Sequence, residues 1–141
     1  MAWQSSTGEL IARMDADDFA YSEKLDQQIQ LLSKHPNLAV CATRVRILKR
    51  SNTGKSSPPD AGYAEYQTWI NSVLSPEQIA TQRFVDSPIP NPTVLLRREI
   101  LEQYKGYRDK IWAEDYDLWL RLLHDGVELG KVDQILLDWY D

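Results

Sequence analysis

Three carboxylates that directly follow a short apolar run constrain this chain more than any other sequence feature. Residues 9–14 have the length of a buried strand, and the run stops abruptly at Asp15-Ala16-Asp17-Asp18. In an α/β sheet, ligands bind beyond the carboxyl ends of the strands. Asp15 and Asp17 can point to the same side of an extended loop and share Mg²⁺ or Mn²⁺, which prefer oxygen ligands. The alternative is a solvated acidic turn that caps the next helix, and the spacing alone leaves both open.

A second acidic constellation, Glu114-Asp115-Tyr116-Asp117, opens an amphipathic helix expected over residues 113–124. The helix dipole favours acidic side chains in a first turn, so helix capping is one interpretation. A carboxylate at this position stays ionised at neutral pH and can act as a general base beside a metal. Asp117 and Arg121 are expected to form a surface pair. The apolar face is expected to contain Trp112, Tyr116, Trp119, Leu120 and Leu123.

Strand and helix patterns alternate along the chain, which predicts an α/β or mixed fold. The 141 residues are expected to form one domain, with a flexible loop over residues 49–62, where no apolar residue exceeds proline in size. Ser22 is expected to cap a helix whose apolar positions are Leu25, Ile29 and Leu32. Further helices are expected at 63–73, 76–84 and 98–104, and strands at 38–48, 93–97, 127–132 and 135–140.

Composition excludes several classes of protein. The net charge of −5 argues against nucleic-acid binding through phosphate neutralisation, and no apolar run reaches the roughly 18 residues of a membrane span. Cys41 is alone, which excludes an internal disulfide and a thiolate zinc cage and fits a reducing compartment. His35 and His124 are the only histidines, so any metal must be held by oxygen.

Four segments in this order resemble the family 2 glycosyltransferases, the large inverting group. The first is the run Gly8 to Asp18, which matches the family's strand into its DxD motif, and the others follow along nearly the whole chain. The second segment combines residues 22–28 and 32–40. The third is Asn91-Pro92-Thr93-Val94-Leu95-Leu96-Arg97-Arg98, and the fourth combines Gly106-Tyr107-Arg108 with the run from Trp112 to Leu122. Any one of these is weak evidence, but their combination and order are specific.

The resemblance implies a nucleotide-diphospho-sugar transferase fold of the glycosyltransferase A type, Rossmann-like, with a mixed sheet and flanking helices. It implies that Asp15 and Asp17 hold Mn²⁺ or Mg²⁺, and that these two with Asp18 bind the diphosphate of a nucleotide sugar. Asp115 takes the position of the catalytic base, with Glu114 as its neighbour and fallback. The implied partners are a nucleotide-diphosphate sugar and a carbohydrate or lipid-linked acceptor. The implied location is cytoplasmic or peripheral to the inner face of the membrane.

One departure from the family pattern concerns the nucleotide base. Family members begin with a strand-helix-strand-helix segment that cradles the base, and nothing here matches it, so residues 1–141 are expected to be the C-terminal two-thirds of a catalytic domain. A sheet without those strands is expected to expose apolar edges. The main hypothesis is a truncated, metal-dependent inverting glycosyltransferase. The alternative is a non-enzymatic remnant of the fold that forms a homo-oligomer or binds a complementing chain.

Overall fold

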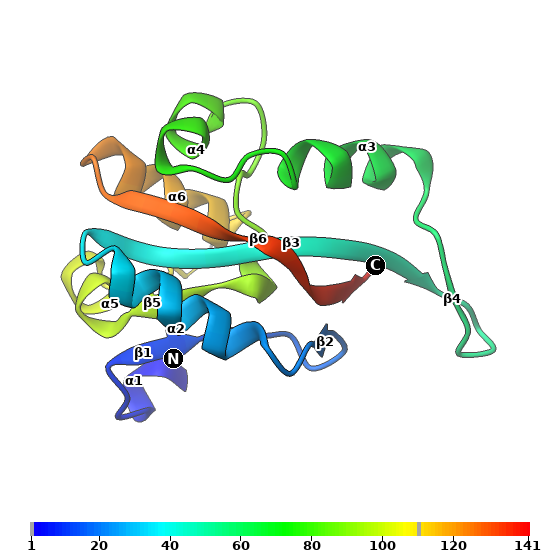
Figure 1. Ribbon diagram of the computed structural model, residues 1–141, viewed down its shortest axis with the longest axis horizontal. Helices are drawn as coiled ribbons and strands as arrows, with labels where there is room; N and C mark the ends of the chain where they lie inside the picture. The colour runs from blue at the N-terminus through cyan, green and yellow to red at the C-terminus, as the bar shows by residue number, and fades with distance from the viewer. Residues whose placement is uncertain (1, 110) are drawn as a thin grey trace.

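The computed structural model describes residues 2–109 and 111–141, and these contain one mixed β-sheet with helices on both faces (Figure 1). Within the described residues the strand order is β1-β5-β3-β6-β2, with β4 paired to β3 alone. β3 and β6 are parallel, and every other pair is antiparallel. The strands are β1 Leu10–Ala12, β2 Phe19–Ala20, β3 Leu38–Arg50, β4 Ser56–Ser57, β5 Leu95–Arg97 and β6 Glu128–Tyr140.

The helices cover the two faces of this sheet, as the alternating side chains of β3 require. Val40 and Ala42 face the cluster built by α5 and α6, whereas Cys41, between them, faces the cluster that includes α2. α3 covers the outer half of β3 through Ile70. The helices are α1 Ala2–Ser5, α2 Lys24–Lys34, α3 Ala61–Ile70, α4 Pro76–Gln82, α5 Arg98–Tyr104 and α6 Glu114–His124, with a 3-10 turn at Asn91–Thr93. The expected α/β fold with a mixed sheet is therefore confirmed.

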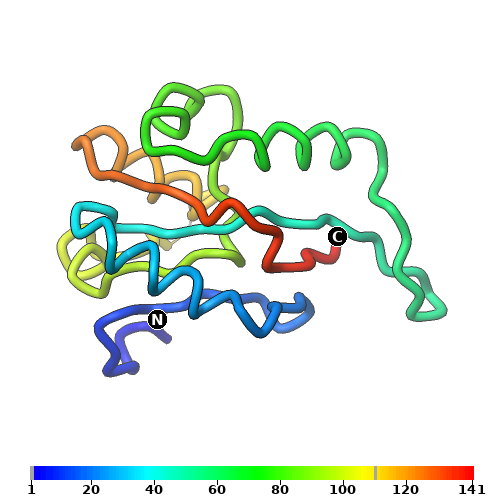
Figure 2. Tube along the Cα trace, in the orientation of Figure 1, coloured from blue at the N-terminus to red at the C-terminus, as the bar shows by residue number. Residues whose placement is uncertain are grey.

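The chain trace shows how two distant segments form the centre of the sheet (Figure 2). β3 and β6 run side by side although almost 80 residues of sequence separate their ends. The alternation predicted for residues 43–47 is present: Thr43, Val45 and Ile47 are buried, and Arg46 between them is exposed. The two strands expected near the C-terminus are one strand, β6, whose pairing with β3 is irregular between Val132 and Ile135.

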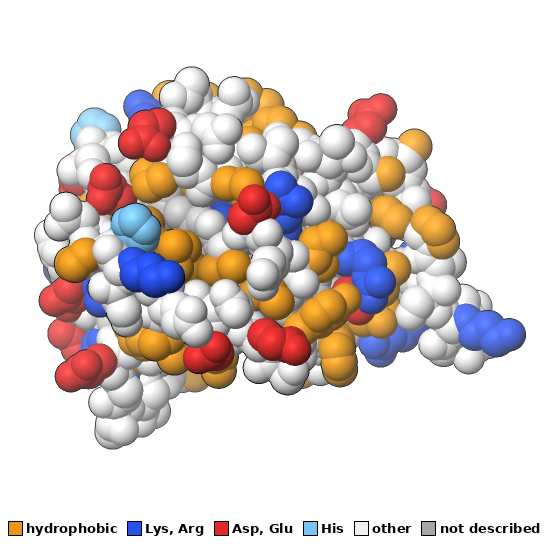
Figure 3. All heavy atoms as spheres, viewed as in Figure 1, with side chains coloured by type: hydrophobic (Ala, Val, Ile, Leu, Met, Phe, Trp, Pro, Cys, Tyr) orange, Lys and Arg blue, Asp and Glu red, His pale blue; other side chains and the backbone are white. Residues whose placement is uncertain are grey.

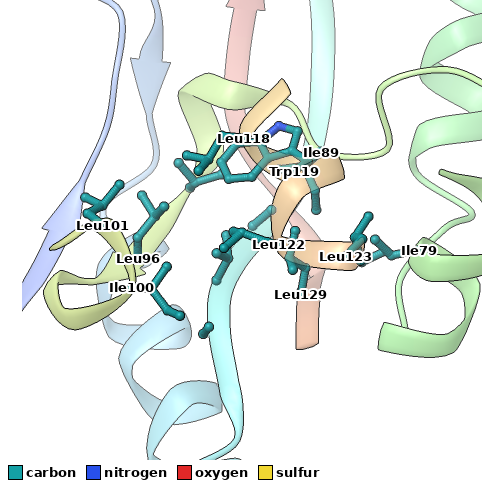
Figure 4. Close-up of a cluster of buried hydrophobic side chains, with 14 of the residues drawn as sticks. Ile79, Ile89, Leu96, Ile100, Leu101, Leu118, Trp119, Leu122, Leu123 and Leu129 are labelled. Atoms are coloured by element: carbon teal, nitrogen blue, oxygen red, sulfur yellow. The ribbon is translucent and has the colours of Figure 1, made fainter. Parts of the chain in front are cut away.

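The main core gathers around α6, whose Trp119 is fully buried (Figure 4). Leu118 and Leu122 pack beside it toward β5 and β6, and Leu123 lies toward α4. The face predicted for this helix was wrong at Trp112, which is 96% exposed. The reason is that α6 begins at Glu114, so Trp112 precedes the helix and has no place on its buried side.

The buried face of α2 also differs from the prediction. Leu25 and Ile29 are 48% and 45% exposed, whereas Gln28 is fully buried. The Gln28 amide donates to the carbonyl oxygens of Cys41 and Thr93, both at 2.7 Å, and these bonds satisfy a polar group that the apolar pattern placed outside. Ser22 is not the N-cap either, because the helix begins at Lys24 after Glu23.

Residues 49–62 contain ordered pairing as well as loop. β3 continues to Arg50, and Lys49 and Arg50 pair with β4. Lys49 also forms an ion pair with Asp60 at 2.8 Å. The resulting hairpin projects from the body of the molecule, at the right of Figures 1 and 3. The flexibility predicted for this segment stays a prediction.

An open sheet edge lies at β1. The amide of Arg13 donates to Val94, and the carbonyl of Glu9 accepts from Arg98, so the backbone groups of Leu10 and Ala12 face away from β5. No strand among the described residues pairs with that side. Apolar atoms are visible among charged side chains along the lower part of this face, where α2 and β1 lie (Figure 3). The expected exposed edge is thus present.

Candidate active site

The loop between β1 and β2 carries the first acidic run, and its three carboxylates have different environments. Asp15 is half-buried and forms an ion pair with Arg13 at 2.6 Å, whereas Asp17 is exposed. Asp18 is buried, and its Oδ1 accepts the backbone amide of Tyr140 at 3.0 Å. Burial raises the pKa of Asp18 above its ordinary value, and the neighbouring Asp15 and Asp17 add to the rise. Asp18 therefore fixes the loop to β6, while Asp15 and Asp17 remain on the solvent side.

The second acidic run lies where α6 begins. Ala113 precedes the helix with φ of 55°, a left-handed conformation that a residue with a Cβ seldom adopts. The turn places Glu114 in solvent and Asp115 half-buried in the first turn, where the helix dipole favours a carboxylate. Within the described part of the chain, the Asp115 side chain makes neither a hydrogen bond nor an ion pair.

The predicted pair between Asp117 and Arg121 is confirmed, but its expected place at the surface was wrong, and Asp117 is structural. Only 18% of the Asp117 side chain and 15% of the Arg121 side chain are exposed, and Arg121 Nε donates to Asp117 at 2.9 Å. Arg121 also donates to the carbonyl oxygens of Tyr104 and Gly106, at 2.9 and 2.8 Å. The pair therefore ties the end of α5 and the loop after it to α6. The end of α5 and the loop after it cover this pair, which a helical pattern alone does not reveal.

Tyr107 stands where the two acidic runs meet. Its hydroxyl donates to Asn91 Oδ1 at 2.9 Å, and its ring packs edge-on against Trp119 at 6.3 Å between centroids. Burial raises the pKa of the Tyr107 phenol. Arg13 opposes that rise, and the nearby carboxylates of Asp115, Glu114 and Asp15 add to it. Tyr107 thus lies within the electrostatic field of both runs.

A cavity of about 650 Å³ joins the two runs directly. Asp15 lines it from the first run, and Glu114 and Asp115 line it from the second. Its volume lies in the range of roughly 300–1,000 Å³ that is usual for small-molecule sites. The remaining wall contains aromatic and polar side chains: Tyr63, Tyr66, Asp86, Ser87, Asn91, Trp112 and Trp139. The structure therefore brings together the candidate base and one of the two candidate metal ligands.

Asp15 and Asp17 are the two carboxylates of the first run that could hold a metal. Among the described residues there is no group of three or more His, Cys, Asp or Glu side chains that could hold a metal. Magnesium commonly uses one or two carboxylates and completes its shell with waters and substrate phosphates, and Asp15 and Asp17 supply that number. The Arg13 ion pair would compete for Asp15. The residues therefore fit a cation bound together with a phosphate ligand.

Sequence reasoning missed Arg13 and the aromatic wall. Arg13 belongs to the apolar run of residues 9–14, whose pattern predicts a buried strand. Its ion pair with Asp15 at the site was therefore not predicted. Tyr63 lies in a helix and Trp139 in a strand, more than seventy positions apart, yet their rings are 6.2 Å apart between centroids. A positive φ at Ala113 could not be anticipated from sequence. The signal in the sequence for this wall was the aromatic residues themselves, Tyr63 and Tyr66 in α3 and Trp139 near the end of β6.

Comparison with known proteins agrees with this description. The mixed sheet with helices on both faces is a glycosyltransferase A-type fold. Residues 1–105 match Glycosyl transferase family 2, and the chain belongs to that family. The chain also superposes on the crystal structure of S. aureus TarS 1–349 with a TM-score of 0.63 and 16% sequence identity, covering 99% of this chain and 38% of TarS.

Curated relatives are similar over nearly the whole chain. The amylovoran biosynthesis glycosyltransferase AmsE of Erwinia amylovora is 24% identical over 93% of this chain and 44% of its own length. The O-antigen biosynthesis glycosyltransferase WbnJ of Escherichia coli is 26% identical over 92% and 46%, respectively. The chain thus spans less than half the length of these relatives. None of the helices in the described residues is both long and apolar enough to cross a membrane.

Proposed function

We propose that this chain carries the metal and base residues of an inverting glycosyltransferase, which transfers a sugar from a nucleotide-diphosphate sugar to an acceptor hydroxyl. The observation that carries the proposal is the cavity that Asp15 and Asp115 line together. Two likenesses support a nucleotide-sugar donor. TarS, which has the same fold at a TM-score of 0.62, has been crystallised with UDP-GlcNAc. A relative from Escherichia coli that is 24% identical over 92% of this chain and 43% of its own length is named a UDP-Gal:alpha-D-GlcNAc-diphosphoundecaprenol beta-1,3-galactosyltransferase.

Each acidic run has one role in this proposal. Asp15 and Asp17 are the residues that would hold Mn²⁺ or Mg²⁺, and Asp18 fixes their loop to β6. A bound cation of this kind neutralises the charge that develops on the leaving diphosphate. Asp115 takes the proton from the acceptor hydroxyl while that oxygen attacks the anomeric carbon from the opposite face, which inverts its configuration. Glu114 lies beside Asp115 in solvent and contributes negative charge.

An activity measurement tests the role of Asp115. The chain is incubated with Mn²⁺, an undecaprenyl-linked or oligosaccharide acceptor, and UDP-glucose, UDP-galactose or UDP-GlcNAc, and release of UDP is followed by chromatography. We expect Asp115→Asn to lower the rate at least 100-fold, since a general base contributes that much, and Glu114→Gln to lower it less than tenfold. Equal loss in the two variants would contradict the assignment of Asp115. No release by the unaltered chain would contradict catalysis by this chain.

The open edge of β1 favours a second function, a non-catalytic protein that binds a partner or a second copy through this fold. Unpaired strand edges are templates for pairing with another chain. Sedimentation with and without UDP and Mn²⁺ separates the two functions. A tight dimer that is indifferent to both supports the second. A monomer that binds the nucleotide only with the metal supports the first.

A further inference from the structure

The open edge of β1 has a defined set of backbone groups. Leu10 and Ala12 direct their amides and carbonyls away from β5, because Glu9 and Arg13 make the backbone bonds to Arg98 and Val94 on that side. Among the described residues no strand pairs with the outer side of β1, and the Ala12 side chain is exposed. The edge therefore presents alternating donors and acceptors that one more strand can use.

A cavity opens on each face of this edge. One, of about 580 Å³, lies on the side of α2, where Leu10 and Ile29 line it. The other, of about 460 Å³, lies between α1 and β1, and its lining includes Ile11 and Trp3. Ile29 is 45% exposed, so apolar surface beside the edge is in solvent. Because the side chains of a strand alternate between the two faces of a sheet, an added strand with neighbouring apolar residues would bury one of them in each cavity.

The sequence of this edge is complementary to itself in the reverse direction. It reads Glu9-Leu10-Ile11-Ala12-Arg13, with Ile11 at its centre. In an antiparallel pair with a second copy centred on Ile11, Glu9 faces the partner's Arg13, and Leu10 faces the partner's Ala12. A parallel pair in register would place Glu9 beside the partner's Glu9 and Arg13 beside the partner's Arg13, where like charges repel. The pattern therefore favours a second copy in the antiparallel direction.

The backbone geometry of β1 agrees with this register. Leu10 and Ala12 carry the outward groups, so each of the two Leu10–Ala12 pairs exchanges both of its backbone hydrogen bonds across the two-fold axis. Ile11 then meets the partner's Ile11 in a pair without hydrogen bonds, whose Cα atoms approach to roughly 4.5 Å. The small side chain of Ala12 leaves room for the partner's Leu10.

We propose that this chain forms a symmetric dimer in which β1 pairs antiparallel with β1 of a second copy, in the register centred on Ile11. The sheet continues from one copy into the other, and Glu9 forms an ion pair with the partner's Arg13 at each end of the pairing. Among the described residues the Glu9 side chain makes neither a hydrogen bond nor an ion pair, so it is available for this contact. The proposal concerns assembly and does not depend on catalysis.

The dimer reaches the candidate active site through Arg13. In the single chain Arg13 forms an ion pair with Asp15 at 2.6 Å, and 32% of its side chain is exposed. A guanidinium has several N–H donors, so it can bond two carboxylates at once. The partner's Glu9 thus joins Asp15 at Arg13, and the second copy adds a carboxylate beside the loop that follows β1.

Sedimentation velocity of the full chain over a range of micromolar concentrations, without nucleotide or metal, tests the proposal. We expect a dimer whose dissociation constant rises about tenfold or more in Glu9→Arg and in Arg13→Glu, because each change places like charges at both ends of the pairing. The variant with both changes restores unlike pairs, and its dissociation constant should return to within about threefold of the original. The matched control is Glu65→Arg, which makes the same charge change on exposed α3 and should not alter the dimer.

Ala12→Pro tests the backbone bonds of the pairing. Proline removes an outward amide that β5 does not use, so the unfolding temperature should be preserved while the dimer is lost. Recovery of the dimer in the double charge variant supports the proposal. A chain that is monomeric at every concentration, or a dimer that the charge variants and Ala12→Pro leave unaltered, overturns it and leaves the edge to a different polypeptide. Binding of UDP with Mn²⁺ is measured on the same samples, so failure of the dimer and failure of the transferase function are seen separately.

Discussion

Asp15 and Asp115 line one cavity although a hundred positions separate them in the sequence. The sheet explains part of the approach: β1 pairs antiparallel with β5, so the loop that leaves β1 begins beside Val94, which precedes β5. After β5, the chain turns at Gly106 and leads through Tyr107 into α6. The first turn of α6 therefore lies near the loop that follows β1. The pairing of two short strands thus assembles the candidate site.

The half-buried ion pair between Asp117 and Arg121 holds that route in place. We expect Arg121→Ala to lower the free energy of unfolding by about 2–3 kcal/mol, because it removes the pair and both backbone carbonyl contacts. The matched control is Arg108→Ala, whose guanidinium is 57% exposed and 3.6 Å from Asp117, and it should cost less than about 0.5 kcal/mol. Urea unfolding followed by tryptophan fluorescence measures both. Equal losses would contradict the structural role of Arg121.

Gln28 links α2 to the sheet from a fully buried position. Gln28→Ala should lower the free energy of unfolding by about 2–4 kcal/mol, because the carbonyl oxygens of Cys41 and Thr93 lose their donor and a cavity remains. Gln30→Ala on the exposed side of the same helix should change it by less than about 0.5 kcal/mol. Thermal unfolding followed by circular dichroism compares the two. A loss that is no larger for Gln28 than for Gln30 would mean that the helix is held by its apolar contacts alone.

Lys131 should make stability depend on pH. Burial lowers its pKa from 10.5 to about 7, the charge of Arg44 adds to this fall, and the Lys131 ammonium donates to the Ile70 carbonyl at 2.6 Å. Between pH 7 and 9 the unfolded chain binds this proton and the folded chain releases it, so the free energy of unfolding should rise with pH. Lys131→Met should flatten that rise. Lys34→Met, which changes an exposed lysine on α2, should leave it unaltered. A rise that is unaltered in Lys131→Met would show that other groups cause it.

Gly106 has a positive φ of 64°, and a Cβ there would lie 2.9 Å from the Trp3 indole nitrogen. We therefore expect Gly106→Ala to destabilise the chain by about 1–2 kcal/mol, through strain and through displacement of Trp3. Gly62→Ala offers the opposite case: its site lies in α3, and a Cβ there meets nothing within 4 Å. This variant should gain up to about 1 kcal/mol from helix propensity. Differential scanning calorimetry should show a lower unfolding temperature for Gly106→Ala and a higher one for Gly62→Ala than for the unaltered chain.

Sequence patterns predicted most of the strands and helices because period and length are local properties. Leu32 of α2 is buried as predicted, but Leu25 and Ile29 are exposed and Gln28 is buried in their place, since the burial of Gln28 depends on carbonyl groups of β3 and the 3-10 turn. Trp112 was placed in the core because its spacing from Trp119 fits a helix, but the chain turns before the helix begins. The two acidic runs were recognised one by one. Their meeting at one cavity depends on long-range pairing, which no local pattern contains.

Calorimetric titration of the chain with UDP, GDP and dTDP, with and without Mn²⁺, tests the central claim most directly. Asp17→Ala is the test variant, and Asp26→Ala, which removes another exposed carboxylate on α2, is the matched control. The account predicts that one nucleotide binds only with Mn²⁺, and that Asp17→Ala abolishes this binding while Asp26→Ala preserves it. If a chain that is folded by circular dichroism binds no nucleotide, or binds one equally well in Asp17→Ala, the account is contradicted.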